Sequence, residues 1–505
     1  MAKSEHPNPE LLRARLFLRL LLVLSFVVLL LRVHALRGLG LADVEALFVG
    51  YALHPQPAYA VHPGLVGVVM RWIAAGDMPS PGSVHLFAAA LATLVPWVAF
   101  LGARGANASW AGALAAALAC ATLPAFVIGH SFITPDLLLA LAWPGAIGCA
   151  ALGLRSDRGT WAALLGWLGA GTLGGLCVMS HAVGGPLVAV LLGAAVINAP
   201  RPRWKNAPLW AAGFVVVVLA SPVVGWEIAN GFSHVRAGIL DPKSPSAISH
   251  AAWVLGGLPL LLTPFPLVAL GALLHDANRR RNDDRIASML WAITVWATAI
   301  VLPVAVLMRE SSPSWLLPPL VPLVFHLARR PEVIRRWLTT ACIATALGSA
   351  CVGWIWVKTD LPTKVLGPKY APLDVSNQLH AWGPGRKLLI DALEATLIRR
   401  HELPTIVGVD QGTCAQAQAT VGHQVRVGCV TLGTSDFDDW LPSREWYDAS
   451  GILLVYDDRI PSSPTVVFPN HTAVALSKTD VRRGGNVVRT IRVIAMDKVR
   501  DIATQ

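Results

Sequence analysis

Two aspartates stand at the edges of long apolar segments, where a carboxylate could act on a substrate held at a membrane surface. Asp43 lies in Ala-Asp-Val-Glu just beyond the first apolar run, and Asp136 ends the stretch His-Ser-Phe-Ile-Thr-Pro-Asp just before another. Two acids on one face of a membrane can share a site, in which one acts as a base and the other orients a hydroxyl. Each aspartate also has a structural interpretation, as the cap of the helix that follows it.

Basic side chains on the same predicted face could bind a phosphate through charge-assisted hydrogen bonds. Five of them lie in external loops or turns: His62, His181, His234, Arg236 and Arg309. Any one of these alone is better explained as a solvated residue or as one that contacts lipid headgroups. Their convergence beside two acids is what favours a site.

Apolar spans must position these residues. Eight stretches are long and uncharged, and each can cross about 30 Å of hydrocarbon. They are 84–103, 110–129, 137–154, 161–179, 182–200, 209–226, 251–274 and 286–308. Residues 16–34 and 338–357 predict two more spans. The short, proline-rich segment 315–328 predicts an eleventh, which we expect to be broken and shielded by neighbouring helices.

The loops between the spans differ in charge on alternate sides. If the N-terminus is cytoplasmic, the inside loops hold fourteen Lys or Arg: Arg104, Arg155, Arg158, Arg201, Arg203, Lys205, Arg279, Arg280, Arg281, Arg285, Arg329, Arg330, Arg335 and Arg336. The outside loops hold five in considerably more sequence: Arg37, Arg71, Arg236, Lys243 and Arg309. The positive-inside rule therefore predicts a cytoplasmic N-terminus and, after eleven spans, an external C-terminal tail.

Composition sets the class of protein. With 54% hydrophobic and 14% charged residues among 505, the chain is too apolar for a soluble domain of this size. The net charge of +11 lies largely in the predicted cytoplasmic loops, and no nucleic-acid recognition motif accompanies it, so we expect no nucleic-acid partner. Cys414 and Cys429 fall in the external tail, where an oxidising compartment would permit a disulfide. The sequence leaves their pairing open.

The chain divides into two predicted domains. Residues 1–357 predict an all-α polytopic membrane domain, and residues 358–505 a small α/β domain. In the tail, 386–400 has helical periodicity, and four segments predict strands: 404–409, 424–430, 451–457 and 486–496. The tail lacks a P-loop and a Gly-x-Gly-x-x-Gly turn, which excludes the usual nucleotide sites. A packing cap or an acceptor-side module is the favoured interpretation.

The first external loop, 36–83, is long and contains two segments with helical character, 42–53 and 64–75. Long ordered loops usually carry function. Its sequence LADVEALFVGYALHPQPAYAVHPGLVGVVMRW resembles the first-loop signature of C-type (GT-C) membrane glycosyltransferases that use polyprenyl-phosphate sugars. The signature has an Asp-Glu-rich start and then Tyr-x-x-His-Pro-Pro-Leu, for which this chain has Tyr59 to Leu65.

Three further segments resemble this family in the same order along the chain. Thr134-Pro135-Asp136 matches a Thr-Pro-Asp before the fourth span, 222–236 matches a Pro-Trp-Gly segment, and Ser314-Trp315 matches an Asn-Trp-Pro region. The chain also departs from the pattern. Val44 separates the usually adjacent acids, Gly64 replaces the second proline, and Ser180-His181 replaces Ser-Lys, so a titratable group stands where the family has a fixed cation.

The resemblance is to the bacterial protein-mannosyltransferase-like and lipid A aminoarabinose- and galacturonosyltransferase-like group, similar to glycosyltransferase family 39. It implies about eleven transmembrane helices, juxtamembrane helices in the first loop and a periplasmic α/β domain. It also implies sugar transfer from a polyprenyl-phosphate donor at the periplasmic face of a bacterial inner membrane. The acceptor would be lipid A, another envelope glycolipid, a polymer or a protein.

The resemblance assigns roles to individual residues. Asp43 would be the base of an inverting transfer, with Glu45 as the alternative if Val44 shifts the register, and Asp136 would bind hydroxyls. The donor and its phosphate would be bound by His62, His181, Arg236, Arg309, Tyr59 and Trp315. No metal or cofactor is required, although a divalent cation could bridge Asp43 and Asp136.

Two other classes of function remain open at this stage. A transporter or flippase for lipid-linked sugars would also place polar groups at the membrane edge, but such proteins tend to have internal repeats and charged or broken helices near the midplane. The sequence shows no internal repeat, and its acids lie at the external edge. A noncatalytic envelope-assembly protein is the third interpretation, and it predicts that neither acid affects a product.

Overall fold

The structure, a computed structural model, describes residues 9–74, 78–157, 159–233, 236, 247–262, 264–308, 311–330, 336–430, 435–459 and 468–499. The chain divides into two compact units. The membrane unit comprises Met1–His34, Val61–Leu65 and Leu86–Gly353. The loop-tail unit comprises Ala35–Ala60, Val66–His85 and Trp354–Gln505. Most of the first external loop is thus grouped with the C-terminal tail, a grouping that the sequence does not reveal.

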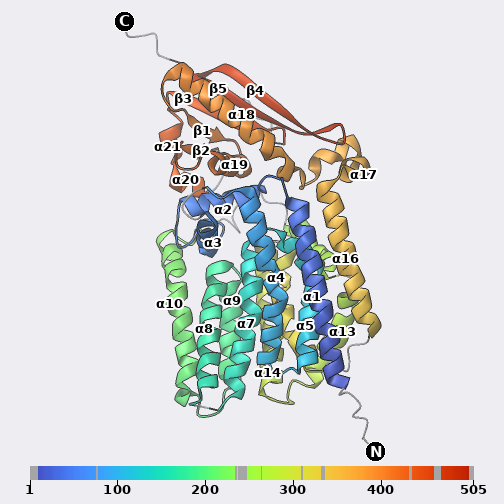
Figure 1. The fold of residues 1–505 in the computed structure, drawn as a ribbon. Helices are drawn as coiled ribbons and strands as arrows, with labels where there is room; N and C mark the ends of the chain where they lie inside the picture. The colour runs from blue at the N-terminus through green and yellow to red at the C-terminus, as the bar shows by residue number, and fades with distance from the viewer. Residues whose placement is uncertain are drawn as a thin grey trace, which may run out of the picture. The chain divides into compact units, whose positions relative to one another are not determined.

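The membrane unit consists of helices that run side by side in a bundle (Figure 1). Its longer helices are α1 (Pro9–Leu36), α4 (Pro81–Gly105), α7 (Pro135–Arg155), α8 (Trp161–Ser180), α9 (Gly184–Asn198), α10 (Ala207–Ala229), α12 (Ala247–Leu262), α13 (Pro264–Arg279), α14 (Arg285–Leu307) and α16 (Arg336–Lys358). Its shorter elements are α5 (Trp110–Ala121), α6 (Pro124–Val127), α15 (Val321–Ala328) and the 3-10 turns η1 (Gly129–Ser131), η2 (Arg203–Lys205), η3 (Pro313–Leu316) and η4 (Pro318–Leu320).

Among the described residues, seven helices are long and apolar enough to cross a membrane: α1, α4, α7, α8, α10, α14 and α16. α5 together with Pro124–Ser131 forms an eighth span that bends by 67°. α9 and Pro313–Ala328 are shorter apolar helices. The predicted span 251–274 is helical on both sides of residue 263, which lies outside the described residues, as α12 and α13. The predicted all-α polytopic domain is confirmed, and the described residues contain seven or eight of its spans at full length.

Prolines explain the broken spans, because proline lacks a backbone N–H and disfavours helix in the residue before it. α5 ends at Ala121, and the chain restarts as a helix at Pro124. The segment predicted to be broken begins as η3 and η4 before it becomes α15. These breaks position candidate residues, since His130 lies in η1 and Trp315 lies in η3.

Small residues allow the membrane-unit helices to approach closely, as is usual for helices packed in lipid. A Cβ atom added to Gly148 of α7 would lie 2.3 Å from the Cα atom of Gly102 of α4. A Cβ atom added to Gly166 of α8 would lie 2.5 Å from the backbone nitrogen of Gly153 of α7. Larger side chains at these glycines would force the backbones apart.

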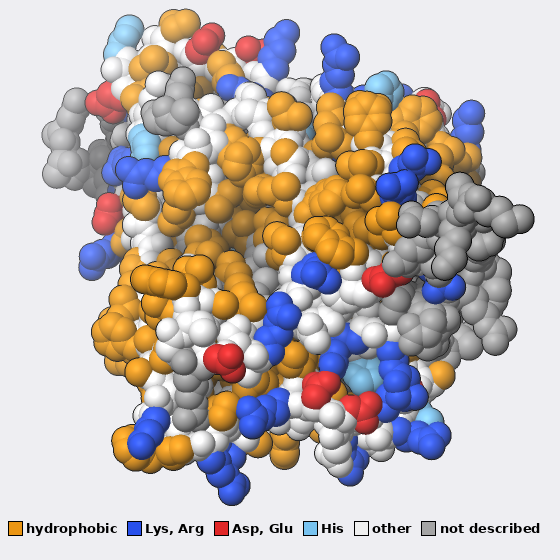
Figure 2. All heavy atoms as spheres, turned by 60° about the horizontal axis from the view of Figure 1, so that its bottom comes forward, with side chains coloured by type: hydrophobic (Ala, Val, Ile, Leu, Met, Phe, Trp, Pro, Cys, Tyr) orange, Lys and Arg blue, Asp and Glu red, His pale blue; other side chains and the backbone are white. Residues whose placement is uncertain are grey.

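The basic loops of the membrane unit gather at the end of the bundle where α1 begins (Figure 1). They include Arg104 at the end of α4, Arg155 at the end of α7, and Arg203 and Lys205 in η2. Figure 2 looks toward this end and shows Lys and Arg more numerous than Asp and Glu among largely hydrophobic side chains. The loops therefore alternate in the way that the charge pattern predicts, while the orientation of this end toward the cytoplasm stays a prediction.

The loop-tail unit contains a sheet of five strands in the order β2-β1-β3-β5-β4. The strands are β1 (Thr405–Gly408), β2 (Val427–Cys429), β3 (Gly451–Asp457), β4 (His471–Arg483) and β5 (Asn486–Lys498). β1 pairs in parallel with β2 and β3, whereas β5 pairs antiparallel with β3 and β4. The four predicted strands are confirmed, and β4 was not predicted.

Helices complete this unit. α18 (Asn377–Arg400), which contains the predicted helix 386–400, packs on β5 and β4. α19 (Gln411–Val421) packs on β1 and β2 and also against α2 (Asp43–Leu53). The other helices are α3 (Leu65–Ala74), α17 (Leu361–Tyr370), η6 (Ala371–Leu373), α20 (Asp436–Trp440) and α21 (Ser443–Trp446). α2 and α3 confirm the two helical segments predicted in the first loop.

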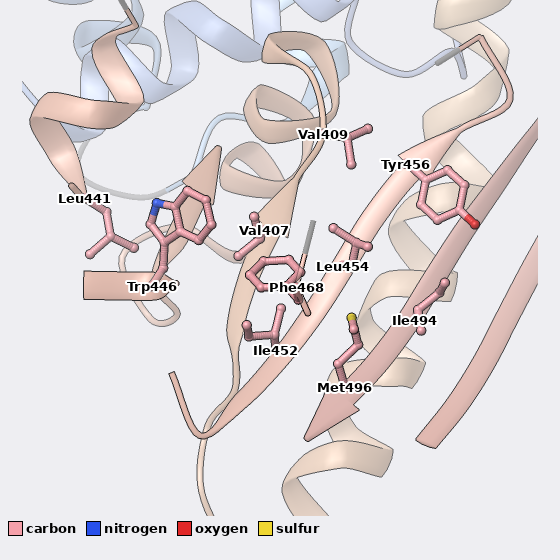
Figure 3. Packing of buried hydrophobic residues seen from close by; sticks show 10 residues of the cluster. All are labelled: Val407, Val409, Leu441, Trp446, Ile452, Leu454, Tyr456, Phe468, Ile494 and Met496. Carbon is pink, nitrogen blue, oxygen red and sulfur yellow. The ribbon is translucent and has the colours of Figure 1, made fainter. Parts of the chain in front are cut away.

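An apolar cluster fills one face of the sheet (Figure 3). Val407 of β1 and Ile452 and Leu454 of β3 are fully buried, and Phe468 and Trp446 pack over them. A disulfide joins Cys414 of α19 to Cys429 of β2, with their Cα atoms 5.7 Å apart. The pairing that the sequence left open is therefore present, and it ties α19 to the sheet.

A buried arginine joins the end of α16 to the sheet. Arg483 of β4 donates to the backbone oxygens of Trp356 at 2.8 Å and of Thr359 at 2.9 Å. Its other terminal nitrogen lies 3.1 Å from Asp374 Oδ2 and 3.0 Å from Asn377 Oδ1. Because these carbonyls end a helix, the guanidinium satisfies groups that would otherwise be buried without partners.

Candidate functional site

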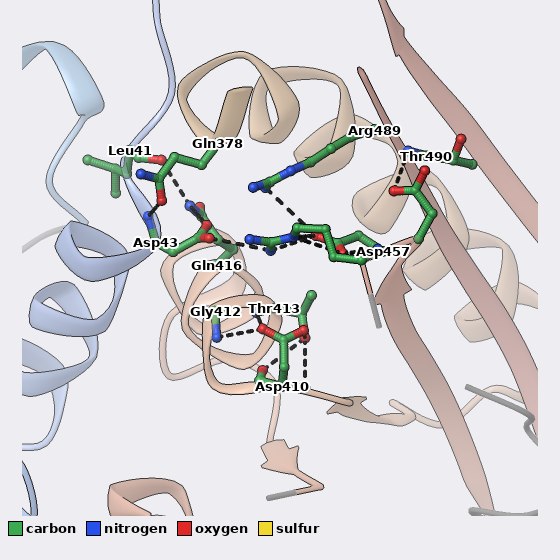
Figure 4. Close-up of polar contacts among 12 residues, drawn as sticks. Leu41, Asp43, Gln378, Asp410, Gly412, Thr413, Gln416, Asp457, Arg489 and Thr490 are labelled. Atoms are coloured by element: carbon green, nitrogen blue, oxygen red, sulfur yellow. Dashed lines mark hydrogen bonds and ion pairs between the residues drawn. The ribbon is translucent and has the colours of Figure 1, made fainter. Parts of the chain in front are cut away.

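Asp43 is the first residue of α2, and the N-cap residue is Ala42. The carboxylate is instead bound within the loop-tail unit, where Gln416 Nε2 donates to Asp43 Oδ1 at 3.1 Å (Figure 4). The Asp43 backbone N–H donates to Gln378 Oε1 at 3.0 Å. The side chain is 17% exposed, so solvent or a substrate can still reach it. Asp43 is therefore not the helix cap. Its contacts instead connect the first loop to the tail.

Charged side chains of the tail surround Asp43. Arg459 Nη2 lies 3.4 Å from Asp43 Oδ2, and Arg459 Nε donates to Asp457 Oδ2 at 2.8 Å. Arg489 Nη1 lies 3.7 Å from the same Asp457 oxygen. Burial alone would lower the pKa of Arg459, but its hydrogen bonds with Asp457 and the nearby carboxylates raise that pKa above its ordinary value. Asp43 thus faces a guanidinium that is already paired.

Glu45 occupies a different environment from Asp43. It is fully buried, and its Oε2 accepts the Ala42 N–H at 3.2 Å and lies 3.1 Å from His85 Nε2 of α4. Two residues along a helix point in different directions, which explains the separation from Asp43. This burial favours a structural role for Glu45 over direct contact with a substrate.

Tyr59 is part of an aromatic cluster in the first loop. Its ring stacks on Tyr51 with centroids 3.6 Å apart, and its hydroxyl donates to the Tyr51 carbonyl at 2.8 Å and accepts the Gln56 N–H at 3.1 Å. Burial raises the pKa of Tyr59 to about 12. The hydroxyl is therefore used within the loop, where it shapes the turn that follows α2.

Asp436 of α20 fastens the same loop. It is 1% exposed, and its carboxylate accepts the Tyr51 hydroxyl at 2.9 Å and the Ala60 N–H at 2.6 Å. Burial raises the pKa of Asp436 to about 6, although both hydrogen bonds oppose that shift. The tail thus holds the first loop at Asp436 as well as at Asp43.

In the membrane unit, Asp136 lies in the first turn of α7. The N-cap is Thr134, whose hydroxyl accepts the Leu137 N–H at 3.3 Å, so Asp136 is free of the predicted capping role. Ser314 Oγ donates to Asp136 Oδ1 at 2.9 Å, and His181 Nε2 lies 3.6 Å from the same oxygen. Three segments that the family resemblance singled out therefore meet at one carboxylate.

His181 has contacts on both ring nitrogens. The Val183 N–H donates to His181 Nδ1 at 3.2 Å, which leaves the proton of a neutral ring on Nε2, facing Asp136. The ring packs edge-on against Trp315, with centroids 4.9 Å apart, and His181 is 4% exposed. This geometry fits His181 and Trp315 as residues that orient Asp136.

A largely apolar cavity of about 250 Å³ opens beside this cluster. Its walls come from α5, α7, η4, α15 and neighbouring helices, and include Phe126, Trp143 and Leu323. Asp136, His130 and Ser314 supply polar groups to its lining. Such a cavity suits an amphiphile with an apolar chain and a polar head.

The structure gives less information about the other predicted cations. His62 is half-buried in the loop after α2. Arg236 is exposed, and its Nη2 donates to the Asn230 carbonyl at 3.1 Å. His234 and Arg309 lie outside the described residues. Asp43 and Asp136 belong to different units, so their predicted cooperation in one site stays a prediction.

The fold matches solved membrane enzymes over nearly the whole chain. ArnT from Cupriavidus metallidurans bound to undecaprenyl phosphate matches with a TM-score of 0.61 at 14% identity, covering 97% of this chain and 98% of that one. The apo form of ArnT gives 0.60 at 15% identity with the same coverage. The chain has the GT-C fold.

A third GT-C structure is similar over less of its length. The archaeal oligosaccharyltransferase AglB from Archaeoglobus fulgidus, in complex with an inhibitory peptide and a dolichol-phosphate, matches with a TM-score of 0.52 at 12% identity. The match covers 87% of this chain and 69% of AglB. At these identities the likeness shows the fold alone.

Sequence comparison identifies part of this GT-C chain more closely. Residues 62–226 match the family described as dolichyl-phosphate-mannose-protein mannosyltransferase. This range contains His62, Asp136 and His181, and it ends before Arg236. A search of curated proteins found no match to this sequence.

Several residues around the candidate acids in this GT-C chain were not predicted. Gln378, Gln416 and Arg459 contact Asp43 from more than three hundred positions away, as the spacing of 373 residues between Gln416 and Asp43 shows. Asp457 in turn contacts Arg459. No local pattern links such residues. Ser314 could have been found from the sequence, because it stands beside Trp315 in a segment that resembles the family.

Proposed function

We propose that this protein transfers a sugar from a polyprenyl-phosphate donor to an acceptor hydroxyl at the external face of a membrane. The observation that carries the proposal is the apolar cavity of the membrane unit, with Asp136, His130 and Ser314 in its lining. The apolar walls suit part of a lipid chain, and the polar groups suit a sugar or phosphate.

The names of two structural relatives agree with this class of donor. The ArnT structure contains undecaprenyl phosphate, and the AglB structure contains a dolichol-phosphate. Both ligands are polyprenyl-type lipid phosphates. We extend that donor class to this chain because the fold and the cavity are compatible with it, and we leave the sugar unspecified.

The reaction we propose is a single displacement. The acceptor oxygen attacks the anomeric carbon while the bond from that carbon to the phosphate oxygen breaks, which inverts the configuration. Asp43 accepts the hydroxyl proton, and the lipid phosphate leaves as an anion. Positive charge beside the leaving group would lower the barrier, a role that we give to His62, Arg236 and Arg309.

Asp136 would bind sugar or acceptor hydroxyls through its Oδ2 atom, since Ser314 and His181 approach only Oδ1. We assign His181 and Trp315 to the orientation of Asp136. This changes the role of His181 from the phosphate contact that the family resemblance implies, because both of its ring nitrogens face groups of the protein.

The disulfide between Cys414 and Cys429 supports an external location for the tail. Disulfides persist in oxidising compartments such as the bacterial periplasm. We therefore propose that the protein lies in a bacterial inner membrane with its tail in the periplasm. The acceptor would then be an envelope glycolipid such as lipid A, a polymer or an exported protein.

A deletion strain and its complement test the proposed function directly. Mass spectrometry of envelope lipids, polysaccharides and proteins should reveal a mass increment of one sugar that is lost in the deletion and restored by the gene. Complementation with Asp43→Asn should fail to restore it. Identical envelope profiles in the deletion and the complement would overturn the proposal.

A further inference from the structure

We propose that the C-terminal tail positions the catalytic base: Gln416 and the cluster of Asp457, Arg459 and Arg489 fix the orientation and the charge environment of Asp43. The inference rests on the proposed function, because it takes Asp43 as the base. It assigns a role in the reaction to a domain that the sequence favours as a packing cap.

Gln416 is placed to orient the carboxylate. It is 4% exposed, and its Nε2 donates both to the Leu41 carbonyl at 2.9 Å and to Asp43 Oδ1 at 3.1 Å (Figure 4). Because one amide nitrogen serves two acceptors, its direction is fixed by the backbone. Gln378 accepts the Asp43 N–H at 3.0 Å. The backbone and the carboxylate of Asp43 are thus bound by two different helices of the tail.

Asp43 Oδ2 is the oxygen left for chemistry. It lies close to the first turn of α19, where a Cβ atom added to Gly412 would be 3.1 Å away. The absence of a side chain at Gly412 provides the space. Arg459 Nη2 donates a long hydrogen bond to Oδ2 at 3.4 Å, which uses one of the two lone pairs of this oxygen. A lone pair of Oδ2 is therefore available to accept a proton.

Asp457 controls how much positive charge Asp43 experiences. It is 1% exposed, and Arg459 Nη2 lies 2.6 Å from its Oδ2. Arg489 is 2% exposed, and its Nη1 lies 3.7 Å from the same Asp457 oxygen. Asp410, at the N-cap of α19, is the other carboxylate near this cluster. Asp457 holds Arg459 away from Asp43, which keeps Asp43 from being fully neutralised.

The two parts of the cluster affect the base in opposite directions. Replacing Gln416 with Leu removes a donor to the ionised carboxylate, so the acidic limb of the pH–rate profile moves to higher pH. Replacing Asp457 with Asn leaves the Arg459 charge unbalanced beside Asp43, which stabilises the ionised form and moves that limb to lower pH. A purely structural role for the tail would move neither limb.

The experiment uses the purified full-length protein with a polyprenyl-phosphate sugar donor. We expect Gln416→Leu and Asp457→Asn each to lower kcat about tenfold or more, with little change in the KM for the donor. We expect their acidic limbs to move in opposite directions. If Asp457→Asn does not fold, Arg459→Gln replaces it, because Arg459 is partly exposed. Removing the Arg459 charge should move the limb to higher pH, so with this replacement the inference predicts shifts in the same direction for both variants and none for the controls.

Matched control variants separate positioning from general loss of stability. Gln418 lies in the same helix, is equally buried and donates to the Gly422 carbonyl at 2.6 Å, so Gln418→Leu removes a comparable bond without contacting Asp43. Asp497 pairs with Arg400 elsewhere in the sheet, so Asp497→Asn is the control for Asp457. Both controls should keep the wild-type pH profile.

The outcomes distinguish this inference from the proposed function. If Asp43→Asn abolishes turnover while Gln416→Leu and Asp457→Asn fold and keep the wild-type kcat and pH profile, the inference is wrong and Asp43 remains the base. If Asp43→Asn keeps its turnover, the assignment of the base fails and the inference fails with it. Opposite shifts of the two limbs, absent from both controls, support the inference.

Discussion

The two units bind their candidate aspartates in different ways. In the membrane unit, Asp136 is contacted by Ser314 and His181, which stand in segments that a sequence pattern can single out. In the loop-tail unit, Asp43 is contacted by Gln416 and Arg459, which belong to no motif. The comparison teaches that the surroundings of one acid can be built from recognisable segments, while those of the proposed base can depend on a domain without a sequence signature.

We expect the largest loss of turnover from a substitution at Asp43, the acid of the loop-tail unit. General bases contribute about 10²–10⁴-fold in rate, so Asp43→Asn should lower kcat by that factor while expression and donor binding stay normal. If Asp43 only ties the first loop to the tail, Asp43→Asn should be nearly silent in turnover and should lower the melting temperature instead. Kinetics and thermal unfolding of the same preparation decide between the two.

The next effect concerns the attachment of the sheet. Arg483→Met leaves Asp374, which is 7% exposed, without its cationic partner, and breaking a buried pair costs about 3–5 kcal/mol. We expect a large fall in the unfolding temperature of the protein in detergent. Arg482→Met is the control, because Arg482 is its exposed neighbour on β4. Equal stabilities of the two variants would contradict the structural role of Arg483.

A smaller effect is expected at the acid of the membrane unit. If Asp136 only orients substrate hydroxyls, Asp136→Asn should lower kcat/KM about tenfold, less than Asp43→Asn does. An amide can still accept the Ser314 hydroxyl, so the fold should persist. A larger loss from Asp136→Asn than from Asp43→Asn would reverse the two roles and would break the comparison between the units.

The raised pKa of Asp436 predicts that the stability of the loop-tail unit depends on pH. Its pKa in the folded protein is about 6, above the ordinary value of 3.8, so the folded state retains a proton that the unfolded state loses. The stability contributed by this group should therefore be full below about pH 4 and should fall as the pH rises toward 6. Urea unfolding of wild type and Asp436→Asn should show a weaker fall in the variant, whereas Asp448→Asn should behave as wild type.

The smallest expected effect tests whether His181 acts through Asp136. His181→Ala should raise the donor KM only severalfold. If His181 orients Asp136, the double variant with Asp136→Asn should lose little more than Asp136→Asn alone, because residues that act together are not additive. Full additivity would instead favour an independent phosphate contact at His181.

Hydrophobic patterning predicted most of the elements but not the supports of the base. The spans and the strands at 404–409 and 451–457 are long apolar runs, so burial alone identifies them. β4 is exposed along most of its length and carries Lys478, Asp480 and Arg482, so only its pairing with β5 defines it as a strand.

α19 shows why the site around Asp43 was not predicted. Its sequence QGTCAQAQATV has no apolar face, because it buries Thr413, Gln416 and Gln418 together with small residues. A helix with buried polar groups on several sides lacks the periodicity that indicates an amphipathic helix. One of those polar groups, Gln416, contacts the first loop at Leu41 and Asp43. The part of the tail with the weakest pattern therefore carries the contacts that matter most for Asp43.

The most direct test of the central claim is a stoichiometric transfer assay with purified protein in detergent. A polyprenyl-phosphate sugar is incubated with envelope extract as acceptor, and both the free lipid phosphate and the glycosylated product are measured. The account predicts one lipid phosphate released for each sugar transferred, and turnover nearly abolished in Asp43→Asn with the fold intact. Absence of transfer by the wild type, or equal transfer by wild type and Asp43→Asn, would contradict it.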